Sequence, residues 1–302
     1  MTLVQLEYIV ALARYRHFSE AAEACGVTQP TLSAMIGKLE DELGVKIFNR
    51  RRQPVTPTPE GQKIIAQAHD VLVQARRIRE LADEQKRSLS GTFRIGILPT
   101  VAPYLLPLFY PQLLNAHPGL DLRMAEMKTA DIAIALQHGD LDAGIVADVD
   151  GLSGLDKRPL YRERFLAYVA ANNPLAAKAT IKTSDLRTED LWLLDEGHCF
   201  ADQMVKFCHL KGASLSRRAY TLGNIETFMR IVEQGRGITF IPELALLPLN
   251  EQQRRLVHPF ALPEPTRLIE WVTAPGFIRH QLAQFIGESI KGAVPQEMVR
   301  RI

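Results

Sequence analysis

Residues 19–43 read SEAAEACGVTQPTLSAMIGKLEDEL, and this stretch decides how the first part of the chain folds. Ser19 is a candidate N-cap for a short helix over residues 20–25, because its hydroxyl can accept a backbone N–H. A glycine–valine turn follows, and Thr28 then caps another helix whose first turn holds Pro30. Two helices joined by so short a turn are typical of a helix-turn-helix.

The second helix of this pair has two different faces. One face is apolar, with spacings of four, three and four residues, and carries Leu32, Ile36, Leu39 and Leu43. The other face has small or hydrogen-bonding side chains that can enter a DNA major groove without a clash: Gln29, Pro30, Thr31, Ser33, Ala34, Gly37 and Lys38. A generic helical hairpin can also have such faces, so the flanking segments decide between the two interpretations.

The segment that follows favours DNA binding. Residues 44–56, GVKIFNRRRQPVT, alternate in a way that predicts two short strands with Arg50, Arg51 and Arg52 at the tip. Such a wing can contact phosphates. Net charge alone does not decide whether this part of the chain binds DNA. Residues 1–90 hold 13 Lys and Arg against 11 Asp and Glu, and so small an excess also suits a solvated face.

A long helix capped at Thr58 comes next. Its apolar positions keep a heptad spacing, and they are Ile64, Ala68, Val71, Ala75, Ile78 and Ala82. An apolar seam of this kind usually packs against another helix, and the simplest partner is the same helix of a second subunit. We therefore expect a winged helix-turn-helix over residues 1–58 and a dimerising linker helix over residues 59–87.

Residues 88–302 predict an α/β regulatory domain after a hinge at residues 88–92. Strand-like and helix-like segments alternate along it, which indicates parallel sheets with crossover helices. Buried strands are expected at residues 93–98, 120–127, 143–146, 164–170, 192–194 and 237–241. The expected layout is two-lobed and periplasmic-binding-protein-like, with lobe I about residues 92–162 and 268–302 and lobe II about residues 163–267.

Two threonines stand where such folds bind ligands. Ligands of open α/β sheets bind beyond the carboxyl ends of strands, and Thr100 and Thr129 both follow strands of lobe I. Each is a candidate helix N-cap, with Thr129 placed to cap a helix over residues 130–138. The functional alternative is that both hydroxyls face a site between the lobes.

The N-terminal block resembles the LysR-type transcriptional regulators. The residues that carry the resemblance are Phe18 to Ala22, Val27 to Ser33, Lys38 to Val45 and Thr58 to Gly61. The resemblance implies a DNA-binding winged helix-turn-helix, a dimerising linker helix and a tetramer made of two dimers.

Cys199 and Cys208 lie nine residues apart. If their segment is helical, they point to opposite faces about 13.5 Å apart along the axis, too far for a disulfide unless the helix breaks. Two inert buried cysteines are one alternative. A metal site built with His198 and His209 is another, disfavoured because adjacent residues rarely ligate one zinc ion together. The third cysteine, Cys25, is expected in the core.

The segment around these cysteines resembles the peroxide-sensing members of the LysR family. The matching runs are Gly197 to Cys199, Asp202 to Gln203, Phe207 to Cys208, Leu98 to Val101, Pro103 to Pro107, and Pro263 to Pro265 followed by Arg267. The resemblance implies that Cys199 is the peroxidatic thiol and Cys208 the resolving thiol. It implies a supporting group of five residues, namely Thr100, Thr129, His198, Asp202 and Arg267.

The sequence thus predicts a cytoplasmic transcription regulator that binds promoter DNA as a homodimer or homotetramer. The regulator is expected to respond to hydrogen peroxide and to need neither a cofactor nor a metal. RNA polymerase and a thiol reductant such as glutaredoxin or thioredoxin are the expected partners. No secretory leader or membrane span is expected. Two alternatives stay open. One is a regulator of the same family that answers a small metabolite. The other is a thiol peroxidase, which has no use for the N-terminal block.

Overall fold

The structure is a computed structural model, and it describes residues 1–50, 52–85, 89–147, 154–187, 190–193 and 224–302. The chain divides into two compact units, Met1–Lys86 and Arg87–Ile302. Among the helices of the described ranges, none has an apolar stretch of the length needed to span a bilayer. The predicted boundaries of the two lobes stay predictions.

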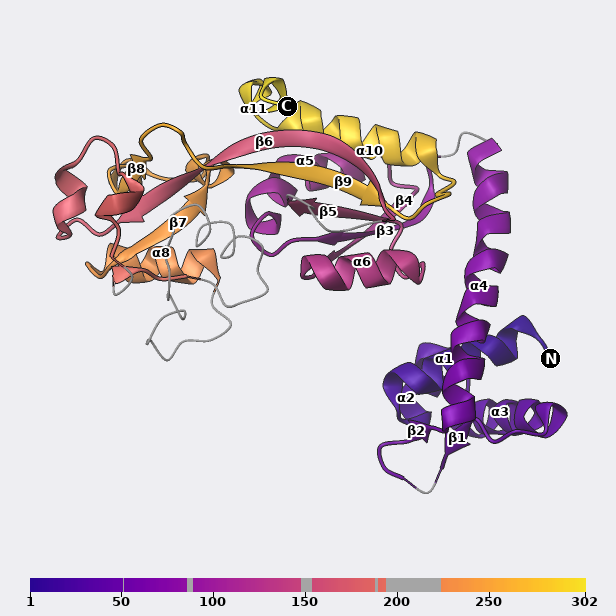
Figure 1. The fold of residues 1–302 in the computed structure, drawn as a ribbon. Helices are drawn as coiled ribbons and strands as arrows, with labels where there is room; N and C mark the ends of the chain where they lie inside the picture. The colour runs from indigo at the N-terminus through magenta and orange to yellow at the C-terminus, as the bar shows by residue number, and fades with distance from the viewer. Residues whose placement is uncertain (51, 86–88, 148–153, 188–189, 194–223) are drawn as a thin grey trace. The chain divides into compact units, whose positions relative to one another are not determined.

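The first unit is a winged helix-turn-helix followed by a long helix, as the sequence predicts (Figure 1). Its elements are α1 (Leu3–Tyr15), α2 (Phe18–Ala24), α3 (Gln29–Leu43), the antiparallel strands β1 (Phe48–Asn49) and β2 (Thr56–Pro57), and α4 (Pro59–Gln85).

Two of the three predicted caps in this unit are confirmed. The Thr28 hydroxyl accepts the N–H of Thr31, and the Thr58 hydroxyl accepts the N–H of Gly61 at 2.9 Å. The prediction for Ser19 is wrong. The α2 helix begins two residues earlier than predicted, with His17 in the extended N-cap conformation and no side-chain cap bond. Ser19 is therefore free to bond outside its own helix.

The wing and α4 meet at a glycine. A Cβ atom on Gly61 would lie 2.0 Å from the carbonyl oxygen of Ile47, so only glycine lets the first turn of α4 approach the wing this closely. The helix then packs along α1 through Ile64 and Ala68, which join the core of this unit. Farther along α4, Val71 and Ile78 are exposed.

The second unit is built on a seven-stranded sheet with the order β4-β3-β5-β9-β6-β7, with β8 also paired to β6. The strands are β3 (Gly91–Ile97), β4 (Leu120–Glu126), β5 (Ala143–Ala147), β6 (Asp156–Val169), β7 (Ile238–Pro242), β8 (Val257–Pro259) and β9 (Thr266–Thr273). The predicted parallel arrangement is right for β4, β3 and β5 and wrong for the rest, because β9, β6, β7 and β8 pair antiparallel.

Helices cover both faces of this sheet. The longer ones are α5 (Ala102–Ala116), α6 (Thr129–Gln137), α8 (Ile225–Glu233), α10 (His280–Ala293) and α11 (Gln296–Arg300). Figure 1 shows α10 and α6 on opposite sides of the β3–β5–β9 region, and α8 packs on β7. A short helix α9 (Glu251–Arg254) and the 3-10 turns η1 (Pro174–Ala177), η2 (Thr183–Asp185) and η4 (Glu243–Leu246) complete the described elements.

Strand β6 belongs to both halves of the sheet. Its residues 156–164 pair with β9, whereas residues 165–169 pair with β7. The transfer from one partner to the other falls between Arg164 and Phe165. Figure 1 shows β6 and β9 as the long strands that run from one lobe to the other. Side chains at this transfer point are therefore within reach of both lobes.

Candidate functional site

Most of the α3 side chains that are predicted to meet DNA are exposed. Gln29, Pro30, Thr31 and Lys38 are all exposed. The hydroxyl of Ser19 donates to Gln29 Oε1 at 2.8 Å, so α2 holds the first side chain of α3. A helix with exposed polar residues in its first turn has the form of a major-groove reader. The individual DNA contacts stay predictions.

Glu40, which sequence reasoning missed, organises the wing. Its side chain is buried, and Oε1 accepts the backbone N–H groups of Ile47 at 2.9 Å and Phe48 at 3.2 Å. Its Oε2 lies 3.4 Å from Lys46 Nζ and 3.2 Å from Arg50 Nη2. One carboxylate therefore fixes both the backbone and the basic side chains at the start of the wing.

Arg50 lies along α3 and does not extend freely into solvent. It donates from Nη1 to Ser33 Oγ at 3.2 Å and lies over the Phe18 ring, 5.6 Å from its centre. The structure thus brings together two predicted DNA contacts, Ser33 and Arg50. Arg52 is exposed. Arg51 lies outside the described residues.

In the second unit the structure joins two predicted site residues that are 167 positions apart in sequence. Arg267 Nη1 donates to Thr100 Oγ1, and Nη2 donates to the Thr100 carbonyl oxygen, both at 3.0 Å. Thr100 is in the β3–α5 turn and Arg267 is on β9, and both side chains are buried. The resemblance grouped these residues, and direct contact between them is what the structure adds.

Glu163 on β6 completes this cluster. Its Oε1 lies 2.8 Å from both Nε and Nη2 of Arg267, and its Oε2 accepts the N–H of Leu244 at 3.3 Å. Burial raises the pKa of the Glu163 carboxyl, and the Arg267 guanidinium opposes that rise. The nearby Tyr161 hydroxyl is buried, which raises its pKa well above the ordinary value, and Glu163 adds to the effect. Tyr161 therefore stays protonated.

Thr129 is not the helix cap that its position suggested. The N-cap of α6 is Lys128, and Thr129 is the first residue of the helix itself. Strands β3 and β4 are parallel neighbours with Ile97 opposite Glu126. Thr129 therefore follows β4 at the same edge of the sheet where Thr100 follows β3, and it is half-buried.

The remaining predicted site residues, Cys199, Cys208, His198 and Asp202, lie outside the described residues. Cys25 is a free, half-buried thiol that packs against the core of the first unit. Burial, together with the charge of Glu7, raises its pKa. Within the ranges that the structure describes, no three His, Cys, Asp or Glu side chains are placed to hold a metal ion.

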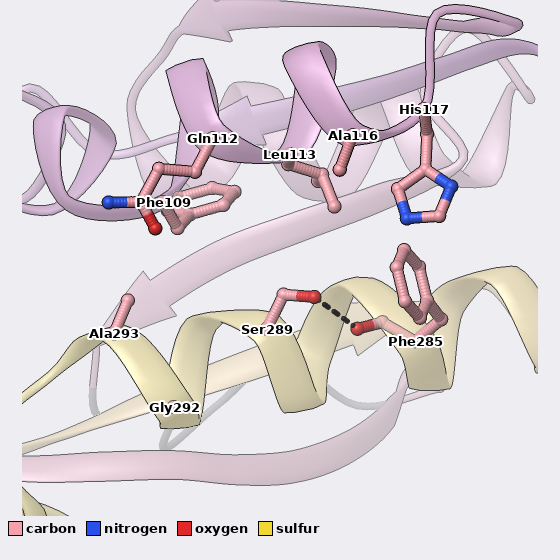
Figure 2. Close-up of a pocket in the computed structure, with 9 residues that line it drawn as sticks. All are labelled: Phe109, Gln112, Leu113, Ala116, His117, Phe285, Ser289, Gly292 and Ala293. Atoms are coloured by element: carbon pink, nitrogen blue, oxygen red, sulfur yellow. Dashed lines mark hydrogen bonds between the residues drawn. The ribbon is translucent and has the colours of Figure 1, made fainter.

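A groove of about 290 Å³ lies between α5 and α10, and none of the predicted site residues is among the residues that line it (Figure 2). The His117 ring meets the Phe285 ring edge-on across it, with 4.8 Å between ring centres. Its lining is otherwise mainly apolar, with Gln112 and Ser289 as the other polar side chains. None of the described residues that line it is an Asp, Glu, Lys or Arg.

Sequence reasoning missed both Glu40 and Glu163, because each looks like an exposed charge between other charges. A signal was present for Glu163. In a strand the side chains alternate between faces, and Tyr161 and Phe165 on the same face as Glu163 are large and apolar. A carboxylate between two such residues indicates a buried charge that needs a cationic partner.

Comparisons with known proteins agree with this geometry. Residues 3–62 match the model for the bacterial regulatory helix-turn-helix proteins of the lysR family, and residues 86–290 match the LysR substrate binding domain. The "Hydrogen peroxide-inducible genes activator" of Haemophilus influenzae is 38% identical over 278 residues, which is 91% of each chain. The "DNA-binding transcriptional dual regulator OxyR" of Escherichia coli is 37% identical over 96% of this chain and 95% of the relative.

Solved structures give the same result. A variant of full-length OxyR from Pseudomonas aeruginosa has a TM-score of 0.75 at 36% identity, covering 97% of this chain and 99% of that one. OxyR from Porphyromonas gingivalis has a TM-score of 0.65 at 40% identity, covering 69% of this chain and 95% of that one. These family descriptions and names are those of DNA-binding regulators, not of enzymes.

Proposed function

The chain belongs to the LysR family of bacterial helix-turn-helix regulators, and we propose that it is a DNA-binding transcription regulator that senses hydrogen peroxide. The observation that carries the proposal is its 38% identity, over 91% of its length, to a relative named for hydrogen peroxide-inducible genes. The buried Thr100–Arg267 contact supports it, because it joins residues from distant segments at the place where a site is expected.

The proposed chemistry begins with the Cys199 thiolate. Its sulfur attacks one peroxide oxygen, an S–O bond forms, the O–O bond breaks, and hydroxide leaves and takes up a proton. The sulfur of Cys208 then attacks the resulting sulfenic acid, forming a disulfide and releasing water. The two thiols supply the two electrons that reduce the peroxide. Thr100, Thr129, His198, Asp202 and Arg267 are proposed to orient the peroxide and to hold or relay its protons.

The free energy that the disulfide contributes is large enough to drive a regulatory change. It closes a loop of about ten residues, which is worth roughly 2–3 kcal/mol in the chain-entropy account. Coupling between distant sites in regulated proteins is typically about 1–3 kcal/mol. Oxidation can therefore bias the arrangement of the regulatory domains, and so the spacing of the DNA-binding units. A dithiol reductant such as glutaredoxin or thioredoxin is proposed to reduce the disulfide again.

We propose a homodimer joined through α4, and a homotetramer made from two dimers. Val71 and Ile78, which lie on the heptad seam, are exposed within their own unit, and a paired helix would cover them. The promoter is the proposed target of α3 and the wing, through Gln29, Pro30, Thr31, Ser33, Lys38, Arg50, Arg51 and Arg52. RNA polymerase is the proposed partner on the promoter, and the cytoplasm the proposed compartment.

The test is to treat the reduced protein with one equivalent of hydrogen peroxide and measure the intact mass. We expect a loss of two hydrogens in the wild type and no such loss in Cys199→Ser or Cys208→Ser. Footprints of reduced and oxidised protein on a promoter fragment should then differ in extent. An unchanged mass, or a two-hydrogen loss that persists without Cys208, contradicts the proposal.

The match of residues 86–290 to a substrate binding domain favours a second candidate, a regulator that answers a small metabolite. In that case the footprint changes with a metabolite extract under reducing conditions, and peroxide has no effect. The two responses are separated by running the footprint with Cys199→Ser, which removes only the first.

A further inference from the structure

Glu163 has no role in the proposed peroxide chemistry. This residue is directly opposite Arg267 in the antiparallel register of β6 and β9. Both of its carboxylate oxygens are used, Oε1 by Arg267 and Oε2 by the backbone N–H of Leu244. Arg267 and Glu163 have side-chain exposures of 0% and 1%, so water does not compete for either partner.

Three groups among the described residues hold Arg267. Glu163 Oε1 lies 2.8 Å from both Nε and Nη2. Thr100 Oγ1 accepts from Nη1 and the Thr100 carbonyl oxygen accepts from Nη2, both at 3.0 Å. The Phe165 ring centre lies 5.5 Å from the guanidinium carbon. A guanidinium is planar with its donors in a fixed fork, so the position of one edge sets the position of the other. The carboxylate of Glu163 therefore determines where Arg267 meets Thr100.

This contact constrains the Thr100 hydroxyl. A threonine hydroxyl has one hydrogen to donate and two lone pairs to accept with. Arg267 Nη1 can only donate, so it occupies a lone pair of Thr100 Oγ1. The hydroxyl hydrogen must then point away from Arg267, and it is left to donate to another acceptor. If the guanidinium turned away, the direction of the Thr100 hydroxyl hydrogen would no longer be fixed.

We propose that Glu163 is a positioning residue for the peroxide reaction, and that it acts through Arg267 to fix the direction in which Thr100 donates a hydrogen bond to the bound peroxide. The inference rests on the proposed function, because peroxide is the acceptor in question. The competing explanation is that the Glu163–Arg267 pair only holds β6, β9 and η4 together.

A double-mutant cycle separates these explanations. The second-order rate constant for loss of reactive thiol under excess hydrogen peroxide is measured for wild type, Glu163→Gln, Thr100→Val and the double variant. Removing one positioned donor costs about 10²–10³-fold in rate in enzymes, so we expect Thr100→Val to lower the rate constant at least tenfold. Glu163→Gln should lower it by a similar factor, and the double variant should be no slower than Thr100→Val alone.

Two controls and a second test variant accompany the cycle. Thr100→Ser keeps the hydroxyl and should keep a rate close to that of the wild type. Glu243→Gln removes a neighbouring carboxylate that pairs with Arg164 and Arg301. It should lower stability towards urea and leave the oxidation rate unchanged. Glu163→Asp keeps the charge on a shorter side chain and should also react slowly, which provides a second variant if Glu163→Gln does not fold.

The outcomes are distinct. Wild-type rates in a folded Glu163→Gln or Glu163→Asp, or rate losses that multiply in the double variant, overturn the inference and leave the proposed function intact. A wild-type protein whose thiols do not react with peroxide overturns the proposed function and the inference with it. Non-additive losses with unchanged DNA binding by the reduced protein support the positioning role.

Discussion

Gly96 and Gly144 lie opposite each other on the paired strands β3 and β5, and together they leave a hollow that Ile132 of α6 fills. A Cβ on Gly96 would lie 2.8 Å from Ile132 Cγ1, and one on Gly144 would lie 2.5 Å from Ile132 Cγ2. The two glycines therefore set how closely α6 approaches the sheet. Thr129, at the start of that helix, takes its position from this contact.

Gly144→Ala should destabilise the second unit by about 1–3 kcal/mol, because the added methyl forces Ile132 or the strand to move. Urea unfolding followed by circular dichroism measures the change. Gly292→Ala is the matched control, since a Cβ there meets no heavy atom within 4 Å. It should keep or slightly raise stability, because alanine is preferred in a helix. Equal effects of the two substitutions contradict the packing argument.

Glu40→Ala should destabilise the first unit by roughly 2–4 kcal/mol, because two backbone N–H groups lose their acceptor. It should also weaken promoter binding, since the wing and Arg50 lose their anchor. Glu40→Gln keeps an acceptor oxygen and should cost less stability. Thermal unfolding and fluorescence anisotropy with labelled DNA measure the two effects.

Glu42→Ala is the control for that experiment. The Glu42 carboxylate is exposed and meets the N-terminal ammonium group at 2.7 Å, a pairing of a kind worth less than about 1 kcal/mol. The predicted role of Glu40 is wrong if both alanine substitutions leave DNA affinity and the unfolding temperature equally unchanged.

Ile78→Glu should dissociate the proposed dimer without unfolding the subunit. Ile78 is 71% exposed on the heptad seam of α4, so a glutamate costs its own unit little, whereas two glutamates on facing helices repel each other. Sedimentation velocity should show a smaller species. Ala66→Glu adds the same charge at an exposed α4 position off the seam and should sediment like the wild type.

Glu243 should contribute stability that depends on pH. Burial raises the pKa of its carboxyl, but hydrogen bonds from Arg301 and Arg164 outweigh this and lower the pKa below the ordinary value. A lowered folded-state pKa gives stability that is complete above the unfolded-state value, about 4.3 for glutamate, and is lost as pH falls through the folded-state value.

The difference in unfolding free energy between wild type and Glu243→Gln should therefore be largest near neutral pH and shrink on acidification below about pH 4. Urea titrations at a series of pH values measure it. Glu288→Gln removes an exposed carboxylate 3.5 Å from Lys291 and should show little difference at any pH. A constant difference for Glu243→Gln across the series contradicts the assignment.

Local sequence signals predicted the first unit well and the second only in part. Caps such as Thr28, the turn and the apolar spacing of α3 depend on neighbouring residues, so the helix-turn-helix could be predicted directly. Strand partners depend on residues far apart in sequence. The residues next to Glu163 in sequence do not indicate that its strand pairs antiparallel with β9, where Arg267 lies 104 positions later. The contact between Thr100 and Arg267 was beyond reach for the same reason.

The shared strand β6 has a consequence for how the protein is made. All the residues of the first unit precede residue 87, so it can fold while the rest of the chain is still being synthesised. The first lobe of the second unit cannot, because β5 and β6 both need β9 between them. The ribosome must therefore finish nearly the whole chain before this sheet can close. Until then, the edges of β5 and β6 present unpaired backbone N–H and C=O groups, at which newly made chains can pair with one another.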